Sequence, residues 1–362
     1  MVAARCVLSL YILLVTVNMS QALQLINASK VPPQSKFSSV GEDHQPGATA
    51  PYSLCKDGKL LPQLYLLGAA KSGTTTIAEY LLRNGILTQA YPNIEKEWHF
   101  FDWRYYGVQN VTPQFLEGFR SAWMDELPPC TPANEPRMIG DYTPDNLRLV
   151  PLPEGSSAGI EQPNHADLPL TLQYFYGEEL YPKLTFMVMM RDPLERFQSG
   201  WYYSMKMYKL DPEDTFAFDR HLREVLQTAK HNGRYSIRLW QSMYGSQLKS
   251  WLERFEARQF VFAPMMIAVN DVTSTLSSLS KQLGIPVNET HTHLDENSVS
   301  HPSVSEDCSP DTIAMFNHFM EDDHRLLLEE LAKASLEGAS LVGYTGSLGN
   351  KSDIDAWLLS GM

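Results

Sequence analysis

Cysteine is scarce in this chain of 362 residues, which contains only four. No two cysteines form a Cys-x-x-Cys motif and none belongs to a tight cluster with histidine, so the sequence argues against a structural zinc site. Beyond the N-terminal segment three cysteines remain, Cys55, Cys130 and Cys308. In an oxidising compartment this number predicts one disulfide bond and one free thiol. The sequence does not identify the pair.

Basic residues are also few. The chain has 29 Lys and Arg residues against 42 Asp and Glu residues, which gives a net charge of −13. This balance argues against general nucleic-acid binding and against a broad basic surface for membranes. It also disfavours a heavily sulfated polyanion as a ligand, because such a ligand needs a strongly basic groove. The oligomeric state stays open.

The apolar stretch near the N-terminus, Val7 to Val17, is too short to cross a membrane, with about 11 residues against the ~20 required. Arg5 precedes it, and Ser20-Gln21-Ala22 forms a small-residue cleavage site. We therefore interpret residues 1–22 as a cleaved signal peptide, with a signal anchor through residues 7–26 as the alternative. Both place the protein in the secretory pathway. Four Asn-x-Ser/Thr sequons fit a lumenal glycoprotein: Asn27, Asn110, Asn288 and Asn350.

The remaining chain divides into three parts. Residues 23–58 contain four prolines among small and polar residues and predict a flexible stem. We expect one folded domain over residues 59–345, whose composition is ordinary for a globular protein. Residues 346–362 are expected to form a C-terminal tail.

A Walker A motif is missing, although one stretch has the layout of an anion-binding loop. The apolar run Leu64 to Leu67 predicts a buried strand, and the spacing of Ile77, Tyr80 and Leu81 predicts a helix that ends near Gly85. The turn between them directs backbone N–H groups and the positive end of a helix dipole at one point, where a phosphate can bind. Its lysine precedes the second glycine, whereas a Walker A lysine follows it. The candidate binding residues are Lys71, Ser72, Gly73, Thr74 and Thr75; the alternative is an ordinary turn with an exposed lysine.

Charged and aromatic residues meet in Glu95-Lys-Glu-Trp-His-Phe-Phe-Asp102. Beside apolar surface, Glu97 would have a raised pKa and act as a general base. Lys96 and His99 flank it as candidate substrate contacts. The alternative is an edge strand or turn whose aromatic side chains enter the core.

A second apolar run, Leu184 to Met190, predicts another buried strand and ends in Arg-Asp-Pro-Leu-Glu-Arg. Asp192 is placed to cap a helix that begins at Pro193, with Glu195 completing a capping box. Arg191 at the strand end and Ser199 in the following helix would both reach the crevice at the carboxyl ends of parallel strands, where they suit a phosphate. The alternative is a capped helix with a solvated arginine.

Three of these segments carry a family resemblance. Lys71-Ser-Gly-Thr-Thr resembles the 5′-phosphosulfate loop of sulfotransferases that use 3′-phosphoadenosine 5′-phosphosulfate (PAPS). Lys96-Glu-Trp-His-Phe-Phe resembles the Lys-Glu-x-His-Phe-Phe segment of glycosaminoglycan sulfotransferases, the heparan sulfate 3-O- and N-sulfotransferase group, in which the glutamate is the catalytic base. Arg191 and Ser199 match the family's 3′-phosphate site. The resemblance covers roughly residues 60–335.

The resemblance implies a P-loop-like α/β sulfotransferase fold, with a mainly parallel central sheet flanked by helices. It implies PAPS as co-substrate, PAP as product, no metal, and a location in the Golgi lumen. The acceptor would be a glycan, glycosaminoglycan-like, sulfated on a hydroxyl or an amine. Glu97 would remove the acceptor's proton, and Lys71 would stabilise charge on the leaving phosphate oxygen.

Two departures from the family pattern bear on the acceptor. Asp141 and Tyr142 stand before Thr-Pro where the family tends to place Glu and Lys, so both are candidate acceptor contacts of a different kind. The family's Lys-Gly-Arg loop is also missing, and residues 297–302 offer only His301 as a cation. A catalytically silent, secreted glycan-binding relative is therefore one alternative, and a nucleotide-dependent kinase is a less favoured one. The acceptor and the position sulfated stay open.

Overall fold

The computed structural model describes residues 54–88, 97–105, 111–131, 138–153, 156–158, 166–210, 217–284 and 301–361. All of them belong to one compact unit, Thr49–Met362. The predicted signal segment 1–22, most of the predicted stem, and Lys96 lie outside the described residues.

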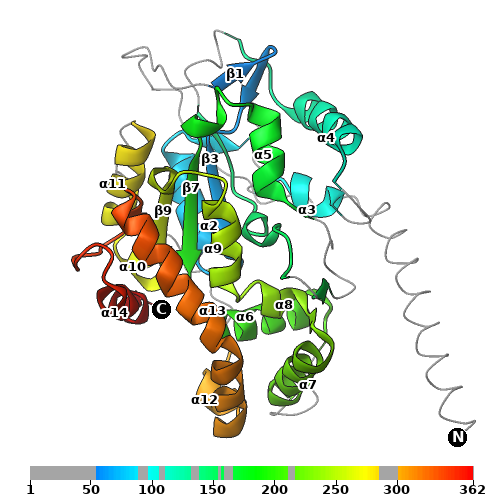
Figure 1. The fold of residues 1–362 in the computed structure, drawn as a ribbon, viewed down its shortest axis with the longest axis vertical. Helices are drawn as coiled ribbons and strands as arrows, with labels where there is room; N and C mark the ends of the chain where they lie inside the picture. The colour runs from blue at the N-terminus through cyan, green and yellow to red at the C-terminus, as the bar shows by residue number, and fades with distance from the viewer. Residues whose placement is uncertain are drawn as a thin grey trace, which may run out of the picture. The chain divides into compact units, whose positions relative to one another are not determined.

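Six parallel strands form the central sheet, in the order β10-β9-β7-β3-β5-β4 (Figure 1). Every residue of the three middle strands β3, β7 and β9 is buried. Helices cover both faces of a sheet of this kind, which is why its strands appear in the sequence as continuous apolar runs. The predicted α/β class with a mainly parallel sheet is confirmed. The strands are β3 (Leu64–Gly68), β4 (Leu87–Thr88), β5 (Ile139–Asp141), β7 (Thr185–Met190), β9 (Phe260–Pro264) and β10 (Ser340–Leu341).

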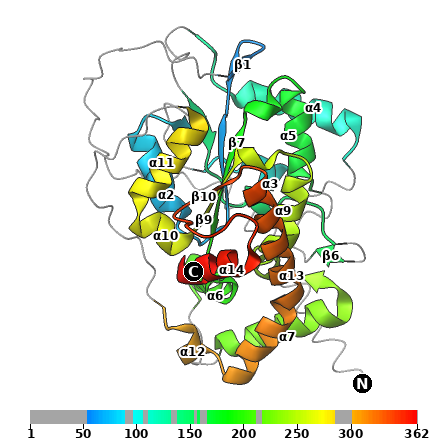
Figure 2. The ribbon, with the colours of Figure 1, turned by 60° about the vertical axis from the view of Figure 1, so that its left-hand side comes forward.

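Two groups of helices cover the two faces of the sheet (Figures 1 and 2). Alternate strand residues point to opposite faces, so Leu64 and Leu66 join one hydrophobic cluster while Tyr65 and Leu67 join the other. The first face is covered by α2 (Thr74–Arg83), α10 (Met265–Asn270) and α11 (Val272–Leu283). The second is covered by α4 (Pro113–Glu126), α5 (Leu168–Tyr176), α9 (Tyr244–Leu252) and α13 (Pro310–Leu336).

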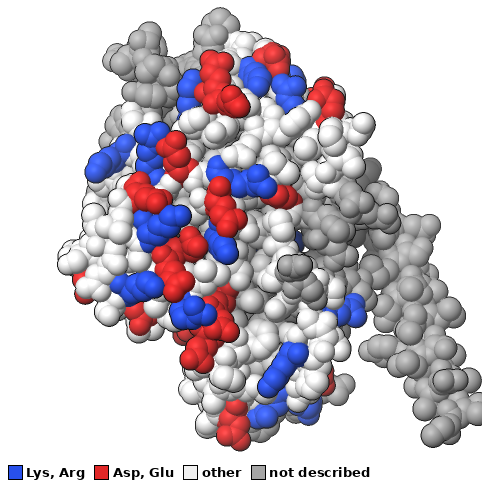
Figure 3. Space-filling view, in the orientation of Figure 1, with Lys and Arg blue, Asp and Glu red and all other residues white. Residues whose placement is uncertain are grey.

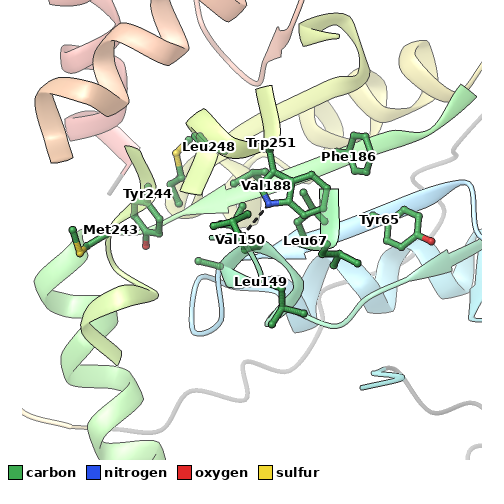
Figure 4. Close-up of a cluster of buried hydrophobic side chains, with 14 of the residues drawn as sticks. Tyr65, Leu67, Leu149, Val150, Phe186, Val188, Met243, Tyr244, Leu248 and Trp251 are labelled. Atoms are coloured by element: carbon green, nitrogen blue, oxygen red, sulfur yellow. Dashed lines mark hydrogen bonds between the residues drawn. The ribbon is translucent and has the colours of Figure 1, made fainter. Parts of the chain in front are cut away.

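The second face holds the larger cluster, part of which is shown in Figure 4. Phe186 of β7 lies against Trp251 of α9, with ring centroids 5.3 Å apart. The Trp251 indole N–H donates to the Leu147 carbonyl at 3.0 Å. This hydrogen bond satisfies the only polar atom of a fully buried side chain and ties α9 to the segment that follows β5.

The fold begins within the predicted stem. Strand β1 (Leu54–Lys56) pairs with β2 (Lys59–Leu61) in an antiparallel hairpin. Cys55 of this hairpin forms a disulfide bond with Cys130, while Cys308 is a buried free thiol. One bridge and one thiol were expected, and the structure supplies the pairing.

The fold also extends into the predicted C-terminal tail. Residues 351–361 form α14 (Lys351–Gly361), which buries Ile354, Trp357 and Leu358. None of the helices in the described part of the chain is long and apolar enough to span a membrane. The other elements are α3 (Phe100–Arg104), α6 (Pro193–Met207), α7 (Ala217–Asn232), α8 (Ile237–Trp240), α12 (Val304–Asp307), the paired strands β6 (Ser157–Ala158) and β8 (Arg234–Tyr235), and the 3-10 turns η1 (Asn146–Arg148), η2 (Tyr181–Lys183) and η3 (Ala257–Gln259).

Candidate functional site

The strand order places a switch point at the centre of the sheet. After β3 the chain moves outward to β4 and β5, and later returns to add β7 on the other side of β3. Open parallel sheets bind ligands at the carboxyl ends of the strands where the order reverses. The two strand ends are adjacent here, because the Ala69 N–H donates to the Met189 carbonyl at 2.8 Å.

The predicted strand–turn–helix at Lys71 is confirmed. β3 ends at Gly68 and α2 begins at Thr74. Gly68 has φ 141°, and a side chain there would overlap the Pro144 carbonyl oxygen. Gly73 has φ 78°, and a Cβ atom there would lie 3.0 Å from Val269. Both positions therefore require glycine, and the tight turn presents the first N–H groups of α2 outward as an anion site.

The hydroxyl groups of the turn differ in exposure. Thr74 is buried and Thr75 is exposed. The Ser72 side chain is fully buried beside the Tyr244 hydroxyl. Its own hydroxyl makes no hydrogen bond of ordinary geometry within the described residues. A buried polar atom of this kind is costly unless a further group satisfies it, which is what an anion oxygen bound in the turn would do.

Lys71 extends from the turn towards α6. Its backbone is in the left-handed region, with φ 71°. Its ammonium group lies 4.1 Å from the centroid of the Tyr203 ring, a distance suited to a cation–π contact.

The predicted cap of α6 is confirmed, but the capping box is wrong. The Asp192 carboxylate accepts hydrogen bonds from the backbone N–H groups of Leu194 and Glu195 at 3.0 and 2.9 Å. The Glu195 carboxylate does not turn back to the helix N-terminus. It accepts from Nε and Nη2 of Arg191, both at 3.2 Å, because a guanidinium four residues earlier is a stronger partner than a backbone N–H.

Both arginines of the Arg-Asp-Pro-Leu-Glu-Arg motif contact the Lys71 turn. Arg191 donates to the Lys71 carbonyl at 3.5 Å, and Arg196 donates to the Ala70 carbonyl at 3.4 Å. The structure thus brings the two predicted phosphate motifs together. Ser199 lies half-buried in the second turn of α6, as predicted.

Sequence reasoning did not assign a role to Arg196. It is fully buried, and burial lowers its pKa to about 10. Its guanidinium also donates to the Ser242 hydroxyl at 2.7 Å. The sequence did contain a signal for this role. Arg196 lies one helical turn after Asp192, on the apolar side of α6 between buried Leu194 and Phe197. An arginine in such a position needs hydrogen-bond partners.

The Glu97 segment is held by the end of β5. Residues 97–99 run without regular structure into α3. The alternative interpretation, an edge strand or turn, is therefore not realised as a strand, although Phe100 and Phe101 do enter the core. The Thr143 hydroxyl accepts from the backbone N–H groups of Trp98 and His99, both at 3.1 Å. Since the next residue, Pro144, packs on Gly68, Thr143 links the Glu97 segment to the Lys71 turn.

His99 lies between two carboxylates. Its Nε2 is 3.1 Å from Glu97 Oε2, and its Nδ1 is 2.8 Å from Asp102 Oδ2. Burial opposes the charged imidazolium, but the two hydrogen bonds outweigh burial and raise the pKa of His99 to about 10. The Glu97 side chain is 30% exposed, so an ion pair defines its environment rather than the apolar burial that we expected. Asp102 was not among the predicted site residues, although its position three residues after His99 is a spacing at which two side chains can pair.

Asp141 and Tyr142 are buried, and the structure corrects their predicted contact with an acceptor. Tyr142 lies in the core on the α2 side of the sheet, where its hydroxyl donates to the Ile86 carbonyl at 2.7 Å. Asp141 points to the opposite face and accepts from the Thr143 backbone N–H at 3.0 Å. Burial raises the pKa of Asp141 to about 6. Its carboxylate also accepts from the Asn146 side chain at 3.0 Å, so Asp141 supports the backbone at Thr143.

His301 packs against helix α6: its ring stacks on the ring of Tyr202, with centroids 5.2 Å apart. The Tyr202 hydroxyl donates to the Asp307 carboxylate at 2.8 Å. Within the described ranges, no group of three or more His, Cys, Asp or Glu side chains could hold a metal ion.

A parallel α/β sheet with a glycine turn and an arginine corner at its switch point is an arrangement typical of domains that bind phosphate groups. A profile of the sulfotransferase domain matches residues 61–312, well over half of the chain. The protein therefore belongs to the sulfotransferase domain family and is a transferase by that membership.

Similar proteins include a curated relative and a solved structure. It is 24% identical over 252 residues to a bifunctional heparan sulfate N-deacetylase/N-sulfotransferase 1 of Caenorhabditis briggsae. That match covers 68% of this chain but only 25% of the relative, so the chain spans a quarter of the relative's length. The crystal structure of a sulfotransferase from Alicyclobacillus acidocaldarius aligns with 74% of this chain and 94% of its own, at 19% identity and a TM-score of 0.46.

Proposed function

We propose that the protein transfers a sulfuryl group from PAPS to a hydroxyl or an amine of a glycosaminoglycan-like glycan. The observation that carries the proposal is the meeting of the Lys71 turn and the Arg191 corner, joined by the hydrogen bond from Arg191 to the Lys71 carbonyl. Membership of the sulfotransferase domain family supports the reaction. The relative named for heparan sulfate supports a glycan acceptor.

The residues present fit a nucleotide with charged groups at two ends. The N-terminus of α2, Lys71 and the unsatisfied Ser72 hydroxyl suit the 5′-phosphosulfate. Arg191 and Ser199 suit the 3′-phosphate. When bound, PAPS supplies the sulfuryl group and a phosphate leaving group. The positive charge of Lys71 is placed to stabilise the negative charge that develops on the leaving oxygen.

Glu97 is the residue best placed to take the acceptor's proton. His99 already carries a proton at neutral pH, since its pKa is about 10, and its two nitrogens both face carboxylates. It therefore cannot serve as a base. It fixes one oxygen of Glu97 instead, and Thr143 fixes the backbone that follows.

We also propose that the domain works in the lumen of the Golgi apparatus, either anchored through residues 7–26 or cleaved and secreted. The bond between Cys55 and Cys130 supports an oxidising compartment.

The test is to replace Glu97 with glutamine, which keeps the shape of the side chain but removes the base. We expect transfer from radiolabelled PAPS to fall by about 100-fold or more, while PAP affinity changes less than about twofold because Glu97 lies outside the predicted nucleotide contacts. Exposed Glu178 provides the matched control, since Glu178→Gln should leave both quantities unchanged. Near-normal turnover in Glu97→Gln would disprove the base assignment, and a wild-type protein that binds no PAP would disprove the donor.

A further inference from the structure

Three contacts fix Trp98, the residue that follows Glu97. Its backbone N–H donates to the Thr143 hydroxyl at 3.1 Å. Its ring packs on the ring of Phe100, with centroids 4.9 Å apart. Its indole N–H donates to Oε2 of Glu126, the last residue of α4, at 2.9 Å. The first two contacts belong to the site already described, whereas the third comes from a helix outside it.

Glu126 is an unfavourable residue for the place that it occupies in α4. The C-terminal end of a helix dipole is negative and repels a carboxylate, and the last turn of α4 contains no basic residue. On the face drawn in Figure 3, acidic and basic side chains are interleaved, and carboxylates pair with basic groups, as Asp57 does with Arg120 at 2.7 Å. Alanine at position 126 would suit the helix better. The hydrogen bond to Trp98 therefore explains a carboxylate that helix stability does not favour.

The end of α4 is itself anchored to the hairpin of β1 and β2. The Cys130 backbone N–H donates to the Gly58 carbonyl at 2.9 Å, and the Cys130 side chain forms the disulfide bond with Cys55. Helix ends commonly fray, but these contacts fix the backbone four residues after Glu126. The carboxylate that accepts from Trp98 therefore occupies a defined position.

We propose that Glu126 is a positioning residue, which acts through the Trp98 indole to fix the backbone from which Glu97 extends. The inference rests on the proposed function, since it takes Glu97 as the base. A base must lie within hydrogen-bond reach of the proton that it removes, and a small displacement of a reacting group lowers the rate of transfer. The nucleotide would bind through the Lys71 turn and the Arg191 corner, which lie on other elements, so loss of the Trp98–Glu126 contact should leave PAP affinity unchanged.

The first experiment compares turnover with donor affinity in the full-length protein. Transfer from radiolabelled PAPS to a non-sulfated oligosaccharide that contains glucuronic acid gives kcat, and calorimetry gives PAP affinity. We expect Glu126→Ala to lower kcat about fivefold, the effect of one lost hydrogen bond, with PAP affinity and the denaturant midpoint unchanged. Glu126→Gln keeps an acceptor oxygen and should restore kcat. Glu117, on the same helix, accepts from the Tyr174 hydroxyl at 2.7 Å and supplies the matched control, Glu117→Ala, which should behave like the wild type.

Trp98→Phe removes the donor of the same hydrogen bond and keeps an aromatic ring. It should lower kcat about as much as Glu126→Ala, and the double variant should lose no more than either single variant, because both remove one interaction. Losses that add would overturn the inference, since the two residues would then act independently. So would a fall in the denaturant midpoint of Glu126→Ala that accounts for its lost activity, because the contact would then serve only stability.

Hydrogen exchange tests the positioning role without turnover. The backbone N–H groups of Trp98 and His99 should exchange about fivefold faster in Glu126→Ala than in the wild type, and at the wild-type rate in Glu117→Ala. Unchanged exchange in Glu126→Ala would overturn the inference, whatever the kinetics. A wild-type protein that binds PAP but transfers nothing would refute the proposed function, and the exchange rates would still decide whether Glu126 holds this segment.

Discussion

The environment of His99 differs strongly from that of a free side chain. It was predicted as a substrate contact, but the structure places it between Glu97 and Asp102 with both ring nitrogens engaged. Two carboxylates on either side of one imidazole favour its charged form. His99 is therefore protonated at neutral pH, and its charge helps to hold the two carboxylates in place.

This arrangement predicts the titration of His99. By NMR, its imidazole should titrate near pH 10 rather than at the ordinary value of 6.5, and Asp102→Asn should bring the pKa back towards that value. Because the pKa is higher in the folded than in the unfolded protein, the interaction stabilises the fold fully below about pH 6.5. That stabilisation is lost as the pH rises through about 10. The free energy of unfolding of the wild type, relative to His99→Asn, should decrease across this window. Titration of His99 near 6.5 would contradict the ion pair.

The sequence predicts some residues of the site better than others. Lys71, Arg191 and Asp192 could be placed because each follows directly from a strand end or a helix start, which are local features. Tyr142 could not, because β5 has only three residues and a strand this short shows no alternation that assigns its faces. Asp102 and Arg196 act through partners that become neighbours only after folding.

At the scale of elements, the turn between β3 and α2 depends on a segment that is distant in sequence. Strand β5 leads to Thr143 and Pro144, and the Pro144 carbonyl closes over Gly68. The strand, the turn and the helix were predictable from periodicity. The partner of the turn was not, because no local pattern links residue 68 to residue 144. Glu195 is a different case, because its partner is local: its carboxylate pairs with the guanidinium of Arg191, four residues earlier, instead of capping the helix.

Gly68→Ala should therefore destabilise the fold by about 2 kcal/mol or more, as measured by denaturant unfolding, because the new methyl group meets the Pro144 carbonyl at a φ unfavourable for alanine. Gly85→Ala is the matched control. Gly85 also has a positive φ, 78°, but has open space where its side chain would lie. It should cost only about 1 kcal/mol. Equal costs for the two variants would show that Pro144 does not restrict the turn.

At the scale of the whole molecule, both ends of the fold lie beyond the boundaries that composition predicted. A stretch rich in proline and polar residues predicts a stem, yet Leu54–Lys56 is fixed by pairing with β2 and by the Cys55–Cys130 bond. The last residues lack a strong amphipathic pattern, yet Trp357 is buried and its indole N–H donates to the Val342 carbonyl at 2.9 Å. Contacts made at long range decide both boundaries.

Helix α14 should accordingly contribute to global stability. Trp357→Ala should lower the free energy of unfolding by about 3 kcal/mol or more, because it leaves a cavity and an unsatisfied carbonyl. Leu359→Ala on the same helix should change it by less than about 0.5 kcal/mol, since Leu359 is 67% exposed. If α14 does not contribute to the stability of the domain, both substitutions should have similar, small effects in thermal and denaturant unfolding.

The Arg196 guanidinium joins α6 to two other segments of the chain: the Lys71 turn, through the Ala70 carbonyl, and residues 238–242, through the Arg238 carbonyl and the Ser242 hydroxyl. None of these segments can swing outward alone without stranding a cation in the interior, which is costly. Any opening motion of the domain must therefore carry these segments together as one rigid body.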